Sequence, residues 1–279
     1  MDFKFAFWGT PEVGSKTLEI LKNSGYIPKI IITSPDKPQG RKLVITPPPV
    51  KVWAESNNIQ CLQPEELTED LIDRLRQEDC GLFIVVAYGK IMPEKLINLP
   101  RLGSINIHYS LLPKLRGASP VESAILNGDT ETGVTIQQIA LKMDQGPIIS
   151  QEIINISKDE KTEELKNKLI TLGGNLLVNT LPKIIAGQYE KMEQDENQAT
   201  YSKKIRKEDG LVNLEKETNE NLYNKFRAYH VWPRTFFFKD NKRIIITDAK
   251  LEDGKFQILK VLPEGKKEVK FEDFNRATS

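Results

Sequence analysis

Residues 104–117 read SINIHYSLLPKLRG, and the rest of the chain is organised around this stretch. The apolar residues predict a strand over Ser104–His108, and because side chains alternate along a strand, Asn106 and His108 share one face. A loop with proline and glycine follows the strand, and the carboxylate of Asp144 comes later in the sequence. An amide, an imidazole and a carboxylate can together polarise a carbonyl group and move a proton. The stretch therefore predicts a catalytic site at the end of a strand.

The segments before this stretch alternate between strand and helix patterns. Phe3–Trp8 and Ile27–Thr33 are predicted strands with an amphipathic helix between them, which makes a βαβ unit with parallel strands. Leu82–Ala87 is an unbroken apolar run, typical of a strand that is buried on both faces. The pattern predicts an α/β fold with a Rossmann-like, mostly parallel sheet. Further helices are expected over 50–57, 65–77, 119–126 and 159–185, and further strands over 133–139 and 146–154.

Glycines near the N-terminus give only a weak nucleotide-binding signal. Gly9 and Gly14 have the spacing of a phosphate-binding loop, but Lys16 comes one position too late and Pro11 removes a backbone donor. The GxGxxG fingerprint of dinucleotide-binding proteins is absent from the sequence. Neither class of nucleotide site is therefore favoured.

Residues 34–50 show no periodicity and contain several prolines, so we expect a loop without secondary structure. Two interpretations of this loop stay open. It is either a solvated excursion or a mobile basic loop that folds onto an anionic substrate, with Arg41 and Lys42 leading.

The sequence changes character near its last third. Residues 188–200 are polar and acid-rich and are interpreted as a linker. Short strands are expected over 211–214, 234–239, 243–248 and 256–261, with one helix over 219–229. This pattern predicts a small β-rich domain that resembles an OB-like barrel. The predicted organisation is a catalytic domain over 1–187, the linker over 188–200, and the C-terminal domain over 201–279.

Composition limits the classes of protein that the chain can belong to. Its 279 residues are 39% hydrophobic and 28% charged, which suits one large or two modest globular domains. From Thr200 onward there are 18 Lys and Arg against 13 Asp and Glu, an excess that suggests a polyanion contact. The lone cysteines Cys61 and Cys80 fit packing roles in a reducing cytoplasm. We find no signal peptide and no apolar run of about 20 residues, so we expect no membrane contact.

Beyond this chemistry, the sequence resembles a known family. NIH at 106–108 and SLLPKLRG at 110–117 resemble the signature of the folate-dependent formyltransferases, and GDTETGVT at 128–135 and MDQG at 143–146 extend it at the expected spacing. Other segments resemble the members of this family that act on methionyl-tRNA: FWGTPE at 7–12, PDKP at 35–38, TPPPVK at 46–51, TYSKKI at 200–205, EDG at 208–210 and WP at 232–233.

The resemblance implies a reaction and a role for each predicted catalytic residue. A formyl group would pass from 10-formyltetrahydrofolate to the α-amino group of initiator methionyl-tRNA. Asn106 and His108 would stabilise the charged oxygen of a tetrahedral intermediate. Asp144 would favour the imidazolium form of His108, or would take the amine proton through a water. The protein would be a cytoplasmic enzyme, and we expect a monomer.

The resemblance also implies binding residues. The turn Ser110, Leu111, Leu112 and Pro113 resembles the folate-binding segment of the family. Tyr88, Gly89 and Ile91 follow the strand over 82–87, at the edge where ligands bind in open α/β sheets, and are candidates for the same pocket. Basic side chains are expected on the phosphates of the tRNA: Arg41, Lys42, Lys203, Lys204, Arg206 and Lys207. No metal is expected, since two histidines and no HExxH or CxxC motif leave no ligand set.

Three other functions stay open. A formyltransferase that acts on a nucleotide-linked amino sugar would keep Asn106, His108 and Asp144 but would not need a basic C-terminal domain. A hydrolase would release formate without an acceptor. A non-enzymatic RNA-binding module would tolerate the loss of His108.

Overall fold

The structure is a computed structural model that describes residues 3–40 and 42–277. The chain forms two compact units that interleave in sequence. Unit 1 comprises the chain up to Arg116 together with Gly133–Ile153 and Leu169–Thr200. Unit 2 comprises Gly117–Thr132, Ile154–Lys168 and the chain from Tyr201 onward.

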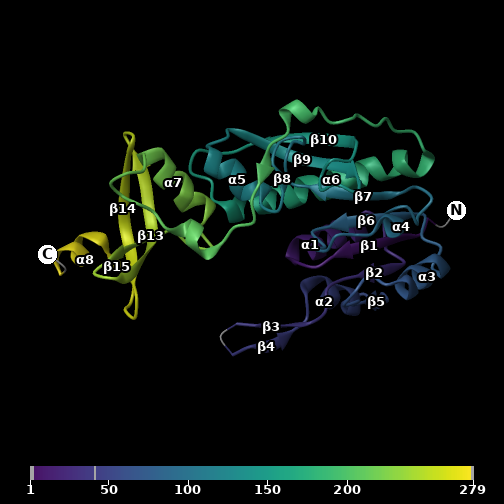
Figure 1. Cartoon of the computed structure of the whole chain (residues 1–279), viewed down its shortest axis with the longest axis horizontal. Helices are drawn as coiled ribbons and strands as arrows, with labels where there is room; N and C mark the ends of the chain where they lie inside the picture. Colours follow the sequence, from purple (N-terminus) through teal and green to yellow (C-terminus); the bar gives the residue numbers. More distant parts are fainter. Residues whose placement is uncertain (1–2, 41, 278–279) are drawn as a thin grey trace. The chain divides into compact units, whose positions relative to one another are not determined.

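A seven-stranded sheet forms the centre of unit 1 (Figure 1). Its strands are, in spatial order, β10 (Ile148–Asn155), β9 (Glu131–Gln138), β7 (Ser104–His108), β6 (Leu82–Val86), β1 (Phe5–Gly9), β2 (Ile30–Ile32) and β5 (Cys61–Leu62). The pairs from β5 through β7 are parallel, and β9 runs antiparallel to β7. The prediction of a mostly parallel sheet is confirmed. Strand β6 is buried along its whole length, as its unbroken apolar sequence predicted.

Helices cover both faces of this sheet. They are α1 (Glu12–Asn23), α2 (Pro49–Ser56), α3 (Glu69–Gln77), α4 (Glu94–Ile97) and α6 (Thr162–Ala186). Leu71, Leu75 and Leu96 from α3 and α4 join a buried cluster with Trp8 and Phe83 of the strands. The amphipathic pattern of each helix thus accounts for the face that it buries.

Helix α6 covers the other face. A Cβ added at its Gly173 would lie 3.1 Å from the side chains of Ile107 and Val134, so the helix lies close against β7 and β9. By length and composition α6 could cross a membrane, but half of its most apolar window is buried inside the protein. It is therefore a core helix. Because side chains alternate along β7, Asn106 and His108 point to the face opposite α6.

The segment over 34–50 was expected to lack secondary structure, and this expectation is wrong. It contains a short antiparallel hairpin of β3 (Lys37–Gln39) and β4 (Val44–Thr46). Both strands lie largely on the surface, and Val44 and Ile45 are about 60% exposed. An exposed hairpin with three residues in each strand leaves no hydrophobic period in the sequence, which is why the pattern missed it.

Unit 2 is built around a four-stranded antiparallel sheet. Its strands are, in order, β12 (Phe236–Lys239), β13 (Lys242–Glu252), β14 (Lys255–Pro263) and β15 (Val269–Lys270). The unit also holds α5 (Pro120–Asn127), α7 (Asn219–Ala228) and α8 (Phe271–Arg276). Leu222 and Phe226 of α7 pack with Ile246 of β13 in one hydrophobic core. The β-rich character predicted for the C-terminal part is confirmed.

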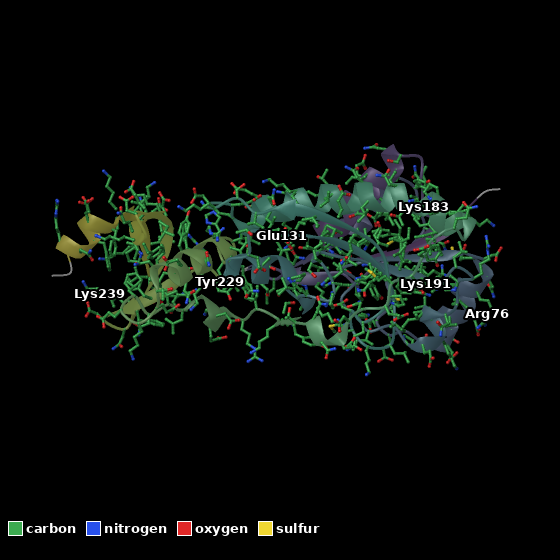
Figure 2. All side chains as sticks on the ribbon, turned by 90° about the horizontal axis from the view of Figure 1, so that it is seen from above. Arg76, Glu131, Lys183, Lys191, Tyr229 and Lys239 are labelled. Atoms are coloured by element: carbon green, nitrogen blue, oxygen red, sulfur yellow. The ribbon has the colours of Figure 1, made fainter. Side chains whose placement is uncertain are left out.

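Smaller elements complete the chain. They are β8 (Arg116–Gly117), β11 (Tyr201–Ser202) and the 3-10 helices η1 (Glu196–Gln198) and η2 (Lys207–Gly210). The prediction of a strand over 211–214 is wrong. Within this segment, pairing is limited to one isolated bridge between Leu211 and Phe236. Arg76 and Lys191, which Figure 2 labels, are exposed charged residues of unit 1.

Candidate active site

Strand β7 carries two of the three predicted catalytic side chains. Its neighbour β9 runs antiparallel to it, with Asn106 opposite Gln137 and His108 opposite Thr135. Side chains that lie directly opposite each other in paired strands point to the same face of the sheet. The four side chains therefore share the face opposite α6, towards the carboxyl end of β7. That end is where open α/β sheets bind their ligands.

The imidazole of His108 is buried, with 6% of the side chain exposed, and has a neighbour at each nitrogen. Nε2 lies 3.0 Å from the carbonyl oxygen of Leu115, and because a carbonyl only accepts hydrogen bonds, Nε2 carries a proton. Nδ1 faces Asp144, with 3.7 Å between Nδ1 and Oδ2. This arrangement fixes the tautomer of the ring, so a second proton would sit on Nδ1 beside the carboxylate.

The carboxylate of Asp144 reaches His108 from the loop between β9 and β10. Gln137 Nε2 donates a hydrogen bond of 3.0 Å to Oδ1, so the two carboxylate oxygens are shared between Gln137 and His108. The backbone of Asp144 has a φ of 54°, in the left-handed region that few residues other than glycine adopt. The structure thus brings His108 and Asp144 together, with Asn106 half-buried beside Gln137.

The turn predicted to bind folate is held by hydrogen bonds to the neighbouring strands β9 and β10 and by one bond within the loop. Ser110 Oγ donates to the Lys114 carbonyl at 2.6 Å, and Thr135 Oγ1 donates to the Ser110 carbonyl at 2.6 Å. The Leu112 amide donates to Thr135 Oγ1 at 3.1 Å, and Gln151 Nε2 donates to the Leu112 carbonyl at 2.8 Å. The polar groups of Ser110 and Leu112 therefore shape the turn.

The two remaining members of this turn are half-buried. The side chain of Leu111 lies against Gly133 of β9, where an added Cβ would come within 2.4 Å of it. The Pro113 carbonyl accepts a hydrogen bond of 3.3 Å from the Thr200 amide. Leu111 and Pro113 therefore present apolar side chains on a turn whose backbone is fixed.

The three residues predicted beyond β6 differ in exposure. Tyr88 is 2% exposed, and its ring meets that of Trp8 edge to face with 5.2 Å between the centroids. Gly89 is exposed and has a φ of 84°, and Ile91 is 81% exposed. Gly89 and Ile91 are therefore available at the surface, whereas Tyr88 belongs to the core beneath them.

The predicted tRNA contacts fall in separate parts of the chain. Arg41 lies outside the described residues, and its neighbour Lys42 is exposed between β3 and β4 of unit 1. Four others are exposed in unit 2, next to β11 and at η2: Lys203, Lys204, Arg206 and Lys207. The contact that these residues were predicted to make remains a prediction.

The structure adds site residues that sequence reasoning missed. Gln137 binds the carboxylate of Asp144, and Gln194 Nε2 donates to the Asp144 carbonyl at 2.9 Å. Arg116, which is fully buried, donates in turn to Gln194 Oε1. Arg116 stands inside the 110–117 signature and could have been singled out there. Gln194 carries no sequence signal, because it comes from the acid-rich stretch interpreted as a linker.

Across residues 3–40 and 42–277, no three His, Cys, Asp or Glu side chains form a group that could hold a metal ion. Burial raises the pKa of both thiols, Cys61 and Cys80, to about 11. Both thiols are therefore protonated at neutral pH and poor nucleophiles.

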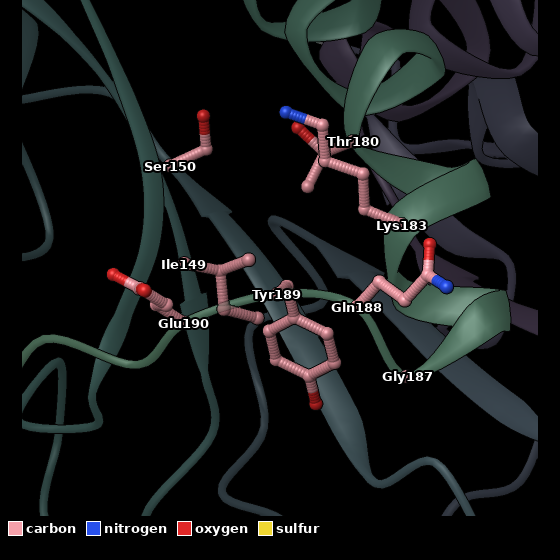
Figure 3. Close-up of a pocket in the computed structure, with 8 residues that line it drawn as sticks. All are labelled: Ile149, Ser150, Thr180, Lys183, Gly187, Gln188, Tyr189 and Glu190. Carbon is pink, nitrogen blue, oxygen red and sulfur yellow. The ribbon is translucent and has the colours of Figure 1, made fainter.

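A pocket of about 510 Å³ lies elsewhere in unit 1 (Figure 3). It is lined by Ile149 and Ser150 of β10, by Thr180 and Lys183 of α6, and by residues 187–190. None of the predicted site residues lines this pocket. Its position therefore does not bear on the chemistry of His108 and Asp144.

Two family models match the chain. The model described as "Formyl transferase" matches residues 3–181, and the model described as "Formyl transferase, C-terminal domain" matches residues 204–258. The first covers all the residues of the candidate site on β7, β9 and the loop that carries Asp144.

Individual relatives agree with these matches. A methionyl-tRNA formyltransferase of Staphylococcus aureus is 41% identical over 89% of this chain and 79% of its own length. A methionyl-tRNA formyltransferase structure from Clostridium thermocellum is 14% identical, with a TM-score of 0.61 over 96% of this chain and 99% of that one. A structure of an N-formyltransferase from Helicobacter canadensis, in complex with folinic acid and dTDP-3-aminofucose, is 22% identical, with a TM-score of 0.66 over 90% of this chain and 89% of that one. The two structures share the fold, and the family models and the Staphylococcus relative decide the family. The chain belongs to the formyltransferase family.

Proposed function

We propose that this chain transfers the formyl group of 10-formyltetrahydrofolate to the α-amino group of initiator methionyl-tRNA. The observation that carries the proposal is the 41% identity, over 89% of the chain, with a methionyl-tRNA formyltransferase. Asn106, His108 and Asp144 supply groups that this reaction needs, and they converge at one end of β7. A cytoplasmic, monomeric enzyme fits this role in translation initiation.

The reaction forms one C–N bond and breaks another. The amine of the methionyl group attacks the formyl carbon, and the carbonyl oxygen gains negative charge in the tetrahedral intermediate. A hydrogen-bond donor aimed at such an oxygen contributes about 2.7–4 kcal/mol. The side-chain amide of Asn106 is one donor, and the imidazole of His108, when it carries a second proton, is another, charge-assisted one.

One proton must move from the amine to the folate nitrogen that leaves. Asp144 is the acceptor best placed for it, because its Oδ2 lies beside His108 Nδ1 while Gln137 keeps its Oδ1 in place. A water between carboxylate and amine would carry the proton first to Asp144 and then to the departing nitrogen. The reaction therefore needs no redox step, and the proton count is balanced.

We expect the folate co-substrate to bind against the turn after β7 and the surface beyond β6. Leu111 and Pro113 offer apolar contacts on a fixed backbone, and Ile91 is exposed at the end of the neighbouring strand. A flat heterocycle binds such a wall through its ring faces while backbone groups read its edges. Gly89, with no side chain, lets the ring approach the backbone closely.

The tRNA is expected to bind through phosphate contacts. Lys203, Lys204, Arg206 and Lys207 are exposed within five residues of the chain and can form such contacts with the acceptor arm. Lys42 is exposed between β3 and β4 and supplies a positive charge in unit 1.

The test is a formyl-transfer assay with three acceptors. Purified protein and 10-formyltetrahydrofolate are incubated with charged initiator tRNA, with a nucleotide-linked amino sugar, or with no acceptor. We expect formyl-methionyl-tRNA as the product. Transfer to the sugar alone, or release of formate without any acceptor, would show that the proposed acceptor is wrong.

A further inference from the structure

The chain from Met192 to Thr200 is attached to both sides of the candidate site. At one end Met192 exchanges two backbone hydrogen bonds, of 2.8 and 2.9 Å, with Ile148 at the start of β10. At the other end the amides of Leu115 and Arg116 each donate a 2.9 Å bond to Thr200. Leu115 is the residue whose carbonyl receives the Nε2 proton of His108. The segment 192–200 therefore spans from the His108 partner to the loop that carries Asp144.

Gln194 stands in the middle of this segment and holds the Asp144 loop. Its Nε2 donates to the backbone carbonyls of Asp144 at 2.9 Å and of Gly146 at 2.7 Å, and it lies 3.4 Å from Gln137 Oε1. Gln137 in turn binds the carboxylate of Asp144. One amide group thus contacts the backbone of Asp144 and the side chain that orients it.

Arg116 fixes the other end of the same amide. Its guanidinium is fully buried and donates to Gln194 Oε1 from Nε at 3.0 Å and from Nη2 at 2.7 Å. It also forms a two-pronged ion pair with Glu196, at 2.8 and 2.9 Å. This hydrogen-bonded pair lowers the pKa of Glu196, so its carboxylate stays charged beside the arginine. The orientation of the Gln194 amide is therefore set by two hydrogen bonds from the planar guanidinium of Arg116.

The backbone of Asp144 needs such support. Its φ of 54° lies in the left-handed region, and aspartate adopts this region more readily than most residues but still only with help from its surroundings. The 3.7 Å between Asp144 Oδ2 and His108 Nδ1 depends on this backbone conformation.

We propose that Gln194 is a positioning residue, which acts through the backbone of Asp144 to keep its carboxylate in place beside His108. The inference rests on the proposed function, because it assigns Asp144 the role of proton acceptor. It predicts that the chemical step depends on Gln194 through the position of the Asp144 carboxylate.

The test compares Gln194→Glu with Gln198→Glu in the full chain. Glutamate at 194 can still pair with Arg116 but cannot donate to the Asp144 and Gly146 carbonyls. Gln198 lies in the same segment and its side-chain amide donates to the exposed Asp195, so its substitution makes the same change of charge away from the loop. The readouts are kcat and KM for methionyl-tRNA, the pH profile of kcat, and thermal unfolding.

We expect Gln194→Glu to lower kcat by about 100-fold, the loss typical of a reacting group misplaced by about 1 Å. KM for methionyl-tRNA should stay within about threefold, since a positioning residue acts on the chemical step rather than on binding of the acceptor. The pH profile of kcat should shift, because displacing the loop changes the surroundings of the acid and base groups that the profile reports. Gln198→Glu should match the wild type. Gln194→Met, which keeps the length of the side chain, should repeat the loss of kcat.

Three results would overturn the inference. They are a Gln194→Glu variant with wild-type kcat and pH profile, equal losses in both glutamate variants, or failure of both Gln194 variants to fold, which would make the residue structural. If the wild-type protein itself formylates no methionyl-tRNA, the proposed function is wrong and the result says nothing in favour of Gln194.

Discussion

At the scale of single residues, the chemistry depends on where protons can sit. His108 has Nε2 committed to the Leu115 carbonyl, so only Nδ1 can change its protonation state without breaking a hydrogen bond. That nitrogen faces Asp144. The ring is therefore held between a backbone carbonyl and a carboxylate, which fixes its orientation at the end of β7.

Replacing His108 by alanine should lower kcat/KM for formyl transfer by about 100- to 10,000-fold, because one oxyanion donor and the partner of Asp144 are both removed. Steady-state kinetics with methionyl-tRNA measures this. The other histidine of the chain is the control: His230 lies in unit 2, and His230→Asn should keep full turnover. Undiminished turnover in the His108 variant would falsify the assignment.

The two thiols give a second prediction at this scale. With pKa values of about 11, raised mainly by burial, Cys61 and Cys80 are roughly one part in a thousand thiolate at pH 8. A disulfide reagent should therefore label the native protein slowly and the urea-unfolded protein rapidly, as followed by absorbance. Fast labelling of one thiol in the folded protein would contradict the packing role.

At the scale of elements, the site depends on a turn with almost no free space. A Cβ at Gly146 would lie 1.7 Å from the carbonyl oxygen of Gln138, a distance that side chains cannot relieve because both partners are backbone. Gly146 thus lets the chain after Asp144 fold back against the end of β9.

Gly146→Ala should therefore displace the Asp144 loop, with a loss of about 1–3 kcal/mol in unfolding free energy and about 100-fold in kcat. Denaturant unfolding and kinetics measure the two effects. The matched control is Gly81→Ala, whose new methyl group would meet nothing closer than 3.4 Å and should change both little. Equal behaviour of the two variants would show that the turn can relax.

The elements show what a sequence can and cannot reveal. Strand β7 was predicted with its observed bounds, since its apolar residues alternate with Asn106 and His108 and a loop ends it sharply. The pairing of His108 with Asp144 could be anticipated from a motif. The hairpin of β3 and β4 and the role of Gln194 could not, because neither depends on local pattern. Gln194 gains its function only when folding brings distant chain segments together.

At the scale of the whole molecule, charge is unevenly distributed along the chain. Lys and Arg exceed Asp and Glu from Thr200 onward, while the earlier residues carry a net negative charge. A polyanion is therefore expected to bind through the later part, with an affinity that falls as salt is added.

Replacing Lys203 and Lys204 by alanine should weaken tRNA binding and flatten its salt dependence by roughly 0.7–0.9 in slope for each phosphate that the variant no longer neutralises. At saturating tRNA, kcat should stay unchanged, because the site on β7 is untouched. Binding isotherms across a salt series measure the slope. The control replaces Lys266 and Lys267, two other exposed lysines of unit 2, and should leave the slope as it was. The same slope change in both variants would point to net charge alone.

The interleaving of the two units has a practical consequence for anyone who tries to dissect the protein. Unit 2 includes two segments from the first two-thirds of the chain, and α5 packs against α7 while the Thr162 hydroxyl bonds to the Ala228 carbonyl. A gene shortened after Thr200 would leave Val121, Ala124 and Ile125 of α5 without that cover. Such a fragment would expose apolar side chains and should aggregate. The separate contributions of the two units are therefore better tested by point substitutions than by truncation.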